Sequence, residues 1–314
     1  MTMTADGMDG ASAIAGEVEV DAPQLRVAIV GTPRSGTTIL AKILGASLGA
    51  ETLVEPFNPI HGIAAATRRY MSADRGDLHT RAAIDTFLAG TGGDFRLGSP
   101  AHRLASWIRP GSNLRTYRRV CRRPPPLLII KDPFLALSAR YLVEAHGFRI
   151  IWALRHPAAV LSSFDRLGWD AGHVMDDWRA EGRIDSLTYV RANDRAARLA
   201  ILWTVINRHL ADVRAARPGT VLAVRHEDFC HDPSAQLATV TRHCGLAPDP
   251  IMQAALARAI GGTLVRPAFR RVHALRRNAG ALPDAWRGQI DATEDATMRT
   301  LCEAAYDELY DMPW

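Results

Sequence analysis

Residues 26–44 read RVAIVGTPRSGTTILAKIL, and this stretch decides the fold. The run from Arg26 to Val30 is apolar enough for a buried β-strand. A glycine-bearing loop from Gly31 to Thr38 follows it. Beyond the loop, apolar residues recur at helical spacing and predict a helix that ends near Gly49; they are Ile39, Leu40, Ile43, Leu44 and Leu48. A strand, a loop and a helix in this order form the first unit of an α/β fold.

Four further apolar runs have the length and composition of buried parallel strands, at residues 51–54, 127–130, 148–154 and 220–224. Most are followed by helical patterns, and Pro157 and Pro233 are placed where helices begin. This alternation predicts an α/β domain with three layers, a P-loop-type open parallel sheet flanked by helices on both faces. Ligands of such sheets bind outside the carboxyl ends of the strands. We therefore expect the reactive side chains directly after each strand.

The loop after the first strand is an expected anion site. Backbone N–H groups of such a loop, and the positive end of the following helix, face a bound phosphate. Arg34 adds a permanent charge, and Thr37 and Thr38 add hydroxyl donors. A nucleotide triphosphatase loop would have lysine directly after the second glycine, where this chain has Thr37. An ATP-using phosphotransferase and a catalytically silent nucleotide-binding protein are the two alternatives that this loop leaves open.

The hexapeptide Pro33-Arg34-Ser35-Gly36-Thr37-Thr38 resembles the 5′-phosphosulfate loop of the sulfotransferase superfamily. Members of that family also have an arginine after a later strand, followed eight residues on by a serine, and Arg155 and Ser163 have this spacing. The resemblance covers roughly residues 25–310 and is nearest to the bacterial and carbohydrate-modifying branches. It implies that the loop binds the 5′ end of 3′-phosphoadenosine 5′-phosphosulfate (PAPS) and that Arg155 and Ser163 bind its 3′-phosphate. No metal is expected.

The same resemblance implies catalytic roles for Glu55, Arg34 and Lys131. Glu55 follows the second strand, where many carbohydrate and tyrosyl-protein members have a glutamate that resembles a general base. Lys131 ends the third strand and is similar to a lysine that faces the transferred sulfate; with Arg34 it would stabilise charge on the leaving phosphate. His61 and His102 are rival bases, since histidine is the base in the cytosolic small-molecule branch. A capping or ion-paired carboxylate is the other interpretation of Glu55.

Two segments near the C-terminus resemble the family more loosely. Residues 224–229 are similar to the turn after its last strand, with His226 in place of the usual tyrosine, and a structural role is expected. Arg276, Arg277 and Trp286 are similar to a segment that closes over the donor. The resemblance implies that Arg276 and Arg277 bind the 3′-phosphate, and solvated charges are the alternative.

The composition fits one globular domain over residues 25–314, preceded by a disordered acidic tail at 1–24. Two polar segments, at about 61–123 and 165–198, break the strand and helix pattern and are expected on the acceptor side. No apolar stretch is long enough to span a membrane. Four cysteines without metal-binding spacing, and a start that lacks a basic stretch followed by an apolar run, predict a cytoplasmic protein. The formal net charge of +5 leaves peripheral contact with an anionic inner membrane face open.

The acceptor is expected to be a hydroxyl-bearing carbohydrate, glycolipid or small molecule, and no nucleic acid is expected. Residues 61–123 contain twelve arginines and four aspartates, without lysine or glutamate, which favours an anionic acceptor. A solvated arginine-rich surface is the alternative. Trp107, Trp169 and Trp178 are candidates for stacking on a sugar or aromatic acceptor, although buried packing is equally common.

Overall fold

A computed structural model describes residues 24–96, 112–260 and 283–314. Within these ranges five strands form one sheet in which all neighbours are parallel, in the order β2-β3-β1-β4-β5. The strands are β1 (Leu25–Gly31), β2 (Ala50–Val54), β3 (Leu127–Lys131), β4 (Arg149–Leu154) and β5 (Val221–Arg225). Each lies within one residue of a predicted run. The predicted strands and the α/β class are thus confirmed.

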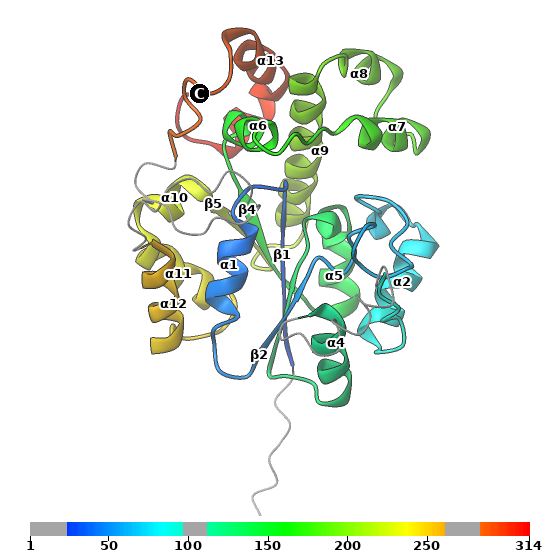
Figure 1. Cartoon of the computed structure of the whole chain (residues 1–314), viewed down its shortest axis with the longest axis vertical. Helices are drawn as coiled ribbons and strands as arrows, with labels where there is room; N and C mark the ends of the chain where they lie inside the picture. Colours follow the sequence, from blue (N-terminus) through cyan, green and yellow to red (C-terminus); the bar gives the residue numbers. More distant parts are fainter. Residues whose placement is uncertain (1–23, 97–111, 261–282) are drawn as a thin grey trace, which may run out of the picture.

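Helices cover both faces of this sheet (Figure 1). Alternate strand residues point to opposite sides, so Val27 and Ile29 enter one apolar core while Ala28 and Val30 enter the other. The first core is closed by α1 (Thr37–Leu44), α11 (Pro233–His243) and α12 (Pro250–Ile260). The second is closed by α5 (Ala139–His146) and α9 (Arg195–Ala216), with α13 (Ala292–Leu309) packed against α9. Burial on both faces explains why the strands are continuously apolar.

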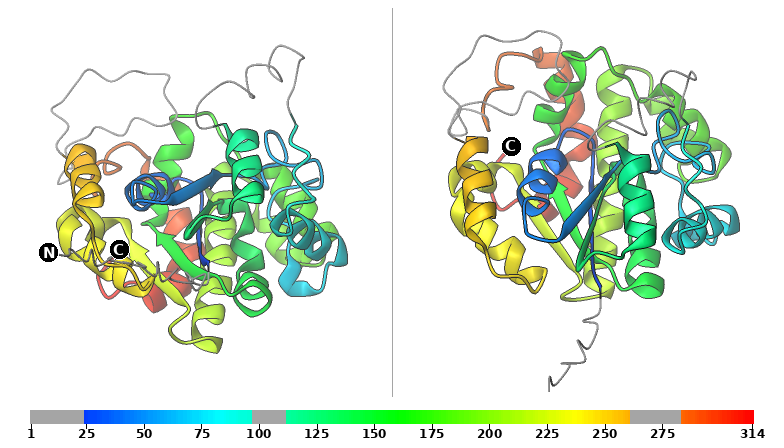
Figure 2. Two further views of the ribbon diagram at one scale, coloured as in Figure 1. Left: turned by 90° about the horizontal axis from the view of Figure 1, so that it is seen from below. Right: turned by 60° about the horizontal axis from the view of Figure 1, so that its bottom comes forward.

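The two polar segments predicted as insertions lie beside each other at one side of the sheet (Figures 1 and 2). An ion pair joins them, between Arg68 Nε and Glu181 Oε1 at 2.6 Å. Helices in and around these segments are α2 (Leu78–Leu88), α4 (Asn113–Arg122), α6 (Pro157–Asp165), α7 (Gly172–Ala180) and α8 (Ser186–Arg191), and α10 (His226–His231) follows β5.

Helix α1 is shorter than the apolar spacing predicts, because it ends at Leu44 and leaves Leu48 exposed. The chain turns at Gly45, whose N–H bonds the Ala41 carbonyl, and returns directly into β2. A Cβ at Gly45 would lie 2.5 Å from Thr52 Oγ1 of β2. Position 45 therefore has room only for glycine between the helix end and β2.

Strand β1 ends at Gly31, which has φ +138 and lies against β4. A Cβ added there would be 2.2 Å from the Ala153 carbonyl oxygen, which is backbone and cannot rotate away. Only glycine fits both the conformation and the space.

We expect Gly31→Ala to lower the free energy of unfolding by about 3 kcal/mol or more, since it adds a backbone clash to a disallowed φ. Gly147→Ala is the matched control: it also has a positive φ, +67, but its Cβ would meet nothing within 4 Å. The control should lose only about 1 kcal/mol. Chemical denaturation measures both, and equal losses would contradict the close approach of β1 to β4.

Candidate active site

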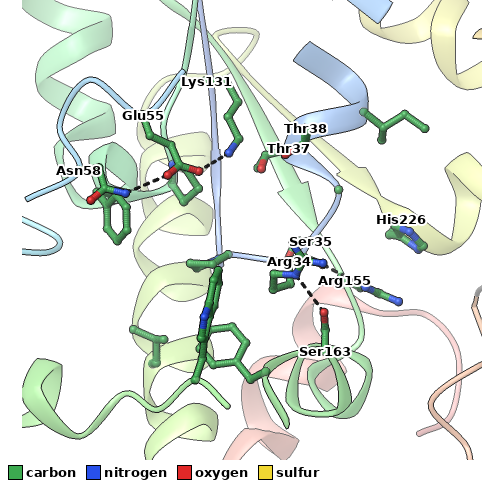
Figure 3. A pocket seen from close by; sticks show the side chains of 18 of the residues that line it. Arg34, Ser35, Thr37, Thr38, Glu55, Asn58, Lys131, Arg155, Ser163 and His226 are labelled. Carbon is green, nitrogen blue, oxygen red and sulfur yellow. Dashed lines mark hydrogen bonds and ion pairs between the residues drawn. The ribbon is translucent and has the colours of Figure 1, made fainter. Parts of the chain in front are cut away.

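A cavity of about 880 Å³ lies at the carboxyl ends of the strands. Each strand of the sheet is followed within three residues by a residue that lines the cavity, or ends on one. In the order in which the strands lie, these residues are Glu55, Lys131, Arg34, Arg155 and His226 (Figure 3). Parallel strands end at the same edge, so five distant segments meet here.

The loop between β1 and α1 has the features of an anion site. Arg34 and Gly36 have left-handed backbones, with φ of 74 and 99, which bend the loop around the cavity. Gly36 is the N-cap of α1 and has no side chain that could accept hydrogen bonds from the first N–H groups of the helix. The positive end of the helix therefore faces the cavity without a side-chain cap. Ser35 Oγ is buried and, among the described residues, has no hydrogen-bond partner. A buried hydroxyl of this kind is expected to bind a ligand.

Arg34, Arg155 and Ser163 meet at one end of the cavity (Figure 3). Arg34 Nε donates to Ser163 Oγ at 2.9 Å, and Arg155 Nη1 donates to the Arg34 carbonyl at 3.0 Å. Burial lowers the pKa of Arg155 from its ordinary value of 12.5. Its Nε is buried without a partner in the described part of the chain. Two cations, a hydroxyl and an unused donor suit a phosphate dianion.

Glu55 and Lys131 meet in a second polar group (Figure 3). Lys131 is only 3% exposed, and its Nζ lies 2.5 Å from Glu55 Oε1. Asn58 Nδ2 donates to Glu55 Oε2 at 2.9 Å, and the Glu55 N–H bonds the Lys131 carbonyl at 2.7 Å. Glu55 has φ 53, an uncommon backbone for this residue type and one that clusters at functional sites. Arg34 points to Ser163 and not to this pair.

Asp132 fixes the backbone around this pair. Its buried carboxylate accepts the N–H groups of Phe57 at 2.6 Å and Phe134 at 2.9 Å. Burial and the charge of Glu55 raise the pKa of Asp132 to about 7. The residue therefore ties the turn after β2 to the turn after β3.

Two histidines adjoin Arg155. His226 lines the cavity beside Gly36, and burial together with the Arg155 charge lowers its pKa to about 3. His156 is the N-cap of α6, with Nδ1 accepting the Ala158 N–H at 3.2 Å, and its ring stacks on Trp286 at 4.6 Å. Burial, Arg287 and Arg155 lower its pKa to about 3 as well. Both rings are thus neutral near pH 7.

The other wall of the cavity comes from the two polar segments. His61, Arg69 and Tyr70 line it from the first, and Trp169 and His173 from the second. For Trp178 the structure supports the alternative of buried packing: α7 turns the side chain into the core, where it is fully buried and packs against Tyr70.

Some predicted site residues lie outside the described ranges, namely His102, Trp107, Arg276 and Arg277. The predicted acidic tail also lies there, apart from Gln24. Other lining residues were not singled out by sequence reasoning. Asn58 had a weak local signal, three residues after Glu55 in the same turn, whereas Arg69, Tyr70 and His173 had none.

None of the described helices is long and apolar enough to cross a membrane.

A family model described as "Sulfotransferase family" matches residues 26–250. A comparison with curated proteins found no match. Among solved structures, the sulfotransferase domain from the curacin biosynthetic pathway is 16% identical, with 93% of this chain and 99% of that chain covered and a TM-score of 0.52. The sulfotransferase domain of the Synechococcus PCC 7002 olefin synthase is 21% identical, with coverages of 92% and 96% and a TM-score of 0.49. The likeness to the curacin-pathway domain supports the fold.

The neutral state of His156 predicts how stability depends on pH. The pKa of His156 in the folded chain, about 3, is below the ordinary 6.5. The contribution of the neutral ring to the free energy of unfolding is therefore present above pH 6.5 and is lost as pH falls toward 3. His156→Asn keeps a cap acceptor for α6 but does not titrate. We expect wild-type unfolding free energy to fall more steeply between pH 6 and pH 4, by about 1.4 kcal/mol per pH unit relative to the variant. Denaturant titrations at several pH values measure this, and parallel slopes would contradict a neutral buried ring.

Proposed function

Because the chain belongs to the sulfotransferase family, and is therefore an enzyme that transfers the sulfuryl group of PAPS, we propose that Glu55 activates the acceptor, a hydroxyl of a carbohydrate, glycolipid or small molecule. One observation carries the proposal: the Glu55–Lys131 pair and the Arg34–Arg155–Ser163 group face one cavity from neighbouring strand ends. The first group has the chemistry to accept a proton, and the second has the chemistry to bind a phosphate.

The donor supplies an activated sulfuryl group on its 5′-phosphate. We assign its 5′ end to the loop Pro33–Thr38, where the Ser35 hydroxyl is buried without a partner in the described ranges. We assign its 3′-phosphate to Arg155 and Ser163, which lie together with Arg34. Arg276 and Arg277 remain predicted contributors to the same phosphate.

In the proposed reaction the Glu55 carboxylate accepts the proton of the acceptor hydroxyl as the new oxygen–sulfur bond forms. The bond between sulfur and the bridging phosphate oxygen breaks, and Lys131 Nζ and the loop N–H groups stabilise the charge on that oxygen. Lys131 and Asn58 each donate a hydrogen bond to the carboxylate and hold it in one orientation. Catalysis by Arg34 at the transferred group stays a prediction.

We also propose a single domain over residues 25–314, in which the segments 61–123 and 165–198 form the acceptor wall. Support comes from the cavity, which both segments line, and from the Arg68–Glu181 ion pair between them.

The donor assignment predicts selective binding of 3′-phosphoadenosine 5′-phosphate (PAP), the desulfated product. Isothermal titration without magnesium should give tighter binding of PAP than of AMP or ATP. Arg155→Ala should weaken PAP binding tenfold to 100-fold, about what a charge-assisted hydrogen bond contributes. Arg149→Ala, at the opposite end of β4, should leave it unchanged. Equal affinity for ATP and PAP would favour an ATP-using phosphotransferase.

The catalytic assignment predicts a loss of turnover without a loss of donor binding. Glu55→Gln should lower kcat about 100-fold or more, and Lys131→Ala should also lower kcat. The assay measures the release of PAP from PAPS in the presence of an acceptor that has been found by screening. Glu51→Gln is the matched control, since Glu51 lies on the same strand but pairs with Arg119 outside the cavity. If Glu55→Gln binds PAP and its kcat is unchanged, Glu55 is not the base, and His61 becomes the candidate.

A further inference from the structure

The arginines of the first polar segment are used in different ways. Arg103 and Arg109 lie outside the described residues. Of the others, Arg68 pairs with Asp77 and Glu181, and Arg119 with Glu51. Arg96 donates to the backbone carbonyls of residues 63, 64 and 66. Within the described part of this segment, Arg69 is the arginine that lines the cavity.

The charge of Arg69 is oriented but not neutralised. Its Nη1 donates to Nε2 of His173, across the junction of the two segments. Burial and the Arg69 charge lower the pKa of His173, so this partner is a neutral imidazole. No ion pair joins Arg69 to a carboxylate of the described ranges. Arg69 therefore presents a net positive charge to the cavity.

Two of the three carboxylates near His173 are bonded to other residues. Asp170, which also lines the cavity, accepts hydrogen bonds from Arg198 Nε at 2.8 Å and Nη2 at 2.7 Å and from the Gly172 N–H. Asp176 accepts the Tyr189 hydroxyl at 2.8 Å. Asp177, one turn after His173 on α7, raises the pKa of His173, but no ion pair joins it to Arg69 within the described ranges.

Tyr70 follows Arg69 in the sequence and lines the same cavity as the proposed base, Glu55. Its ring is held between Phe134 at 5.3 Å and Trp178 at 5.8 Å, and its backbone has φ 56. Burial raises the pKa of Tyr70; the charge of Arg69 opposes this rise, and the charge of Glu55 adds to it. Arg69, Tyr70 and Glu55 all line the same cavity, and the uncommon backbone conformation of Tyr70 is of a kind that clusters at functional sites.

We propose that the acceptor carries an oxyanion, a carboxylate or a phosphate monoester, which binds Arg69 while the acceptor hydroxyl meets Glu55. The inference deepens the proposed function and rests on it. A guanidinium matches the geometry of both anions. Phe134, Phe164 and Trp169 line the same cavity and supply surface for the carbon skeleton between the two groups.

The test uses small probes, because it then needs no identified acceptor. The protein is saturated with PAP, so that the donor cations are occupied, and is titrated with phenyl phosphate and benzoate beside the neutral phenol and benzamide. Ligand-observed NMR at fixed ionic strength gives the dissociation constants. We expect the anionic probes to bind about tenfold more tightly than the neutral ones. Arg69→Gln should abolish this preference, and Arg69→Lys should keep part of it.

Arg75→Gln is the matched control, because Arg75 belongs to the same segment but is exposed and does not line the cavity. It should keep the full preference. Equal binding of neutral and anionic probes to wild type, or a preference that survives in Arg69→Gln, would overturn the proposal. If PAP itself fails to bind, the proposed function fails instead. The same probes, titrated into Arg155→Ala with and without Arg69→Gln, then still decide whether Arg69 binds an oxyanion.

Discussion

The close approach of β1 to β4 at Gly31 is the constraint on which the site depends. With no room for a Cβ beside the Ala153 carbonyl, the chain leaves the sheet in a conformation that only glycine adopts easily. The loop is thereby held near the end of β4, where Arg155 donates to the Arg34 carbonyl and Arg34 reaches Ser163 on α6. One backbone contact thus aligns the loop with a strand end and a helix that follow it by more than a hundred residues in the sequence.

The Glu55–Lys131 pair adds a second constraint, because a buried ammonium is costly without a partner. Glu55 satisfies Lys131, and the backbone bond between the same residues joins the ends of β2 and β3. Asp132 then holds the turn that carries Asn58. The proposed base is therefore also part of the architecture, so its substitution is best judged by turnover and donor binding together.

Much of the fold was predictable because its signals are local. The five apolar runs and the spacing of Arg155 and Ser163 depend only on residues near one another in the chain. The end of α1 was predicted wrongly: the helix ends at Leu44, and the close approach of Gly45 to Thr52 depends on a different element, β2. The pairing of Arg69 with His173 spans 104 positions and comes from two segments without strong periodicity. For Trp178 the choice between stacking on an acceptor and buried packing stayed open, because composition does not reveal the side to which a helix turns.

Charge distribution along the cavity explains why the arginine count alone says little about the acceptor. Described arginines of the first segment pair with carboxylates, donate to carbonyl groups or face solvent, and among them Arg69 alone lines the cavity. Two like charges 10 Å apart repel by about 2 kcal/mol at an effective dielectric constant of 20. A polyanionic donor and an anionic acceptor therefore need cations at both ends of the cavity. Arg34 and Arg155 lie at one end, Lys131 pairs with Glu55, and Arg69 lines the wall that we propose for the acceptor.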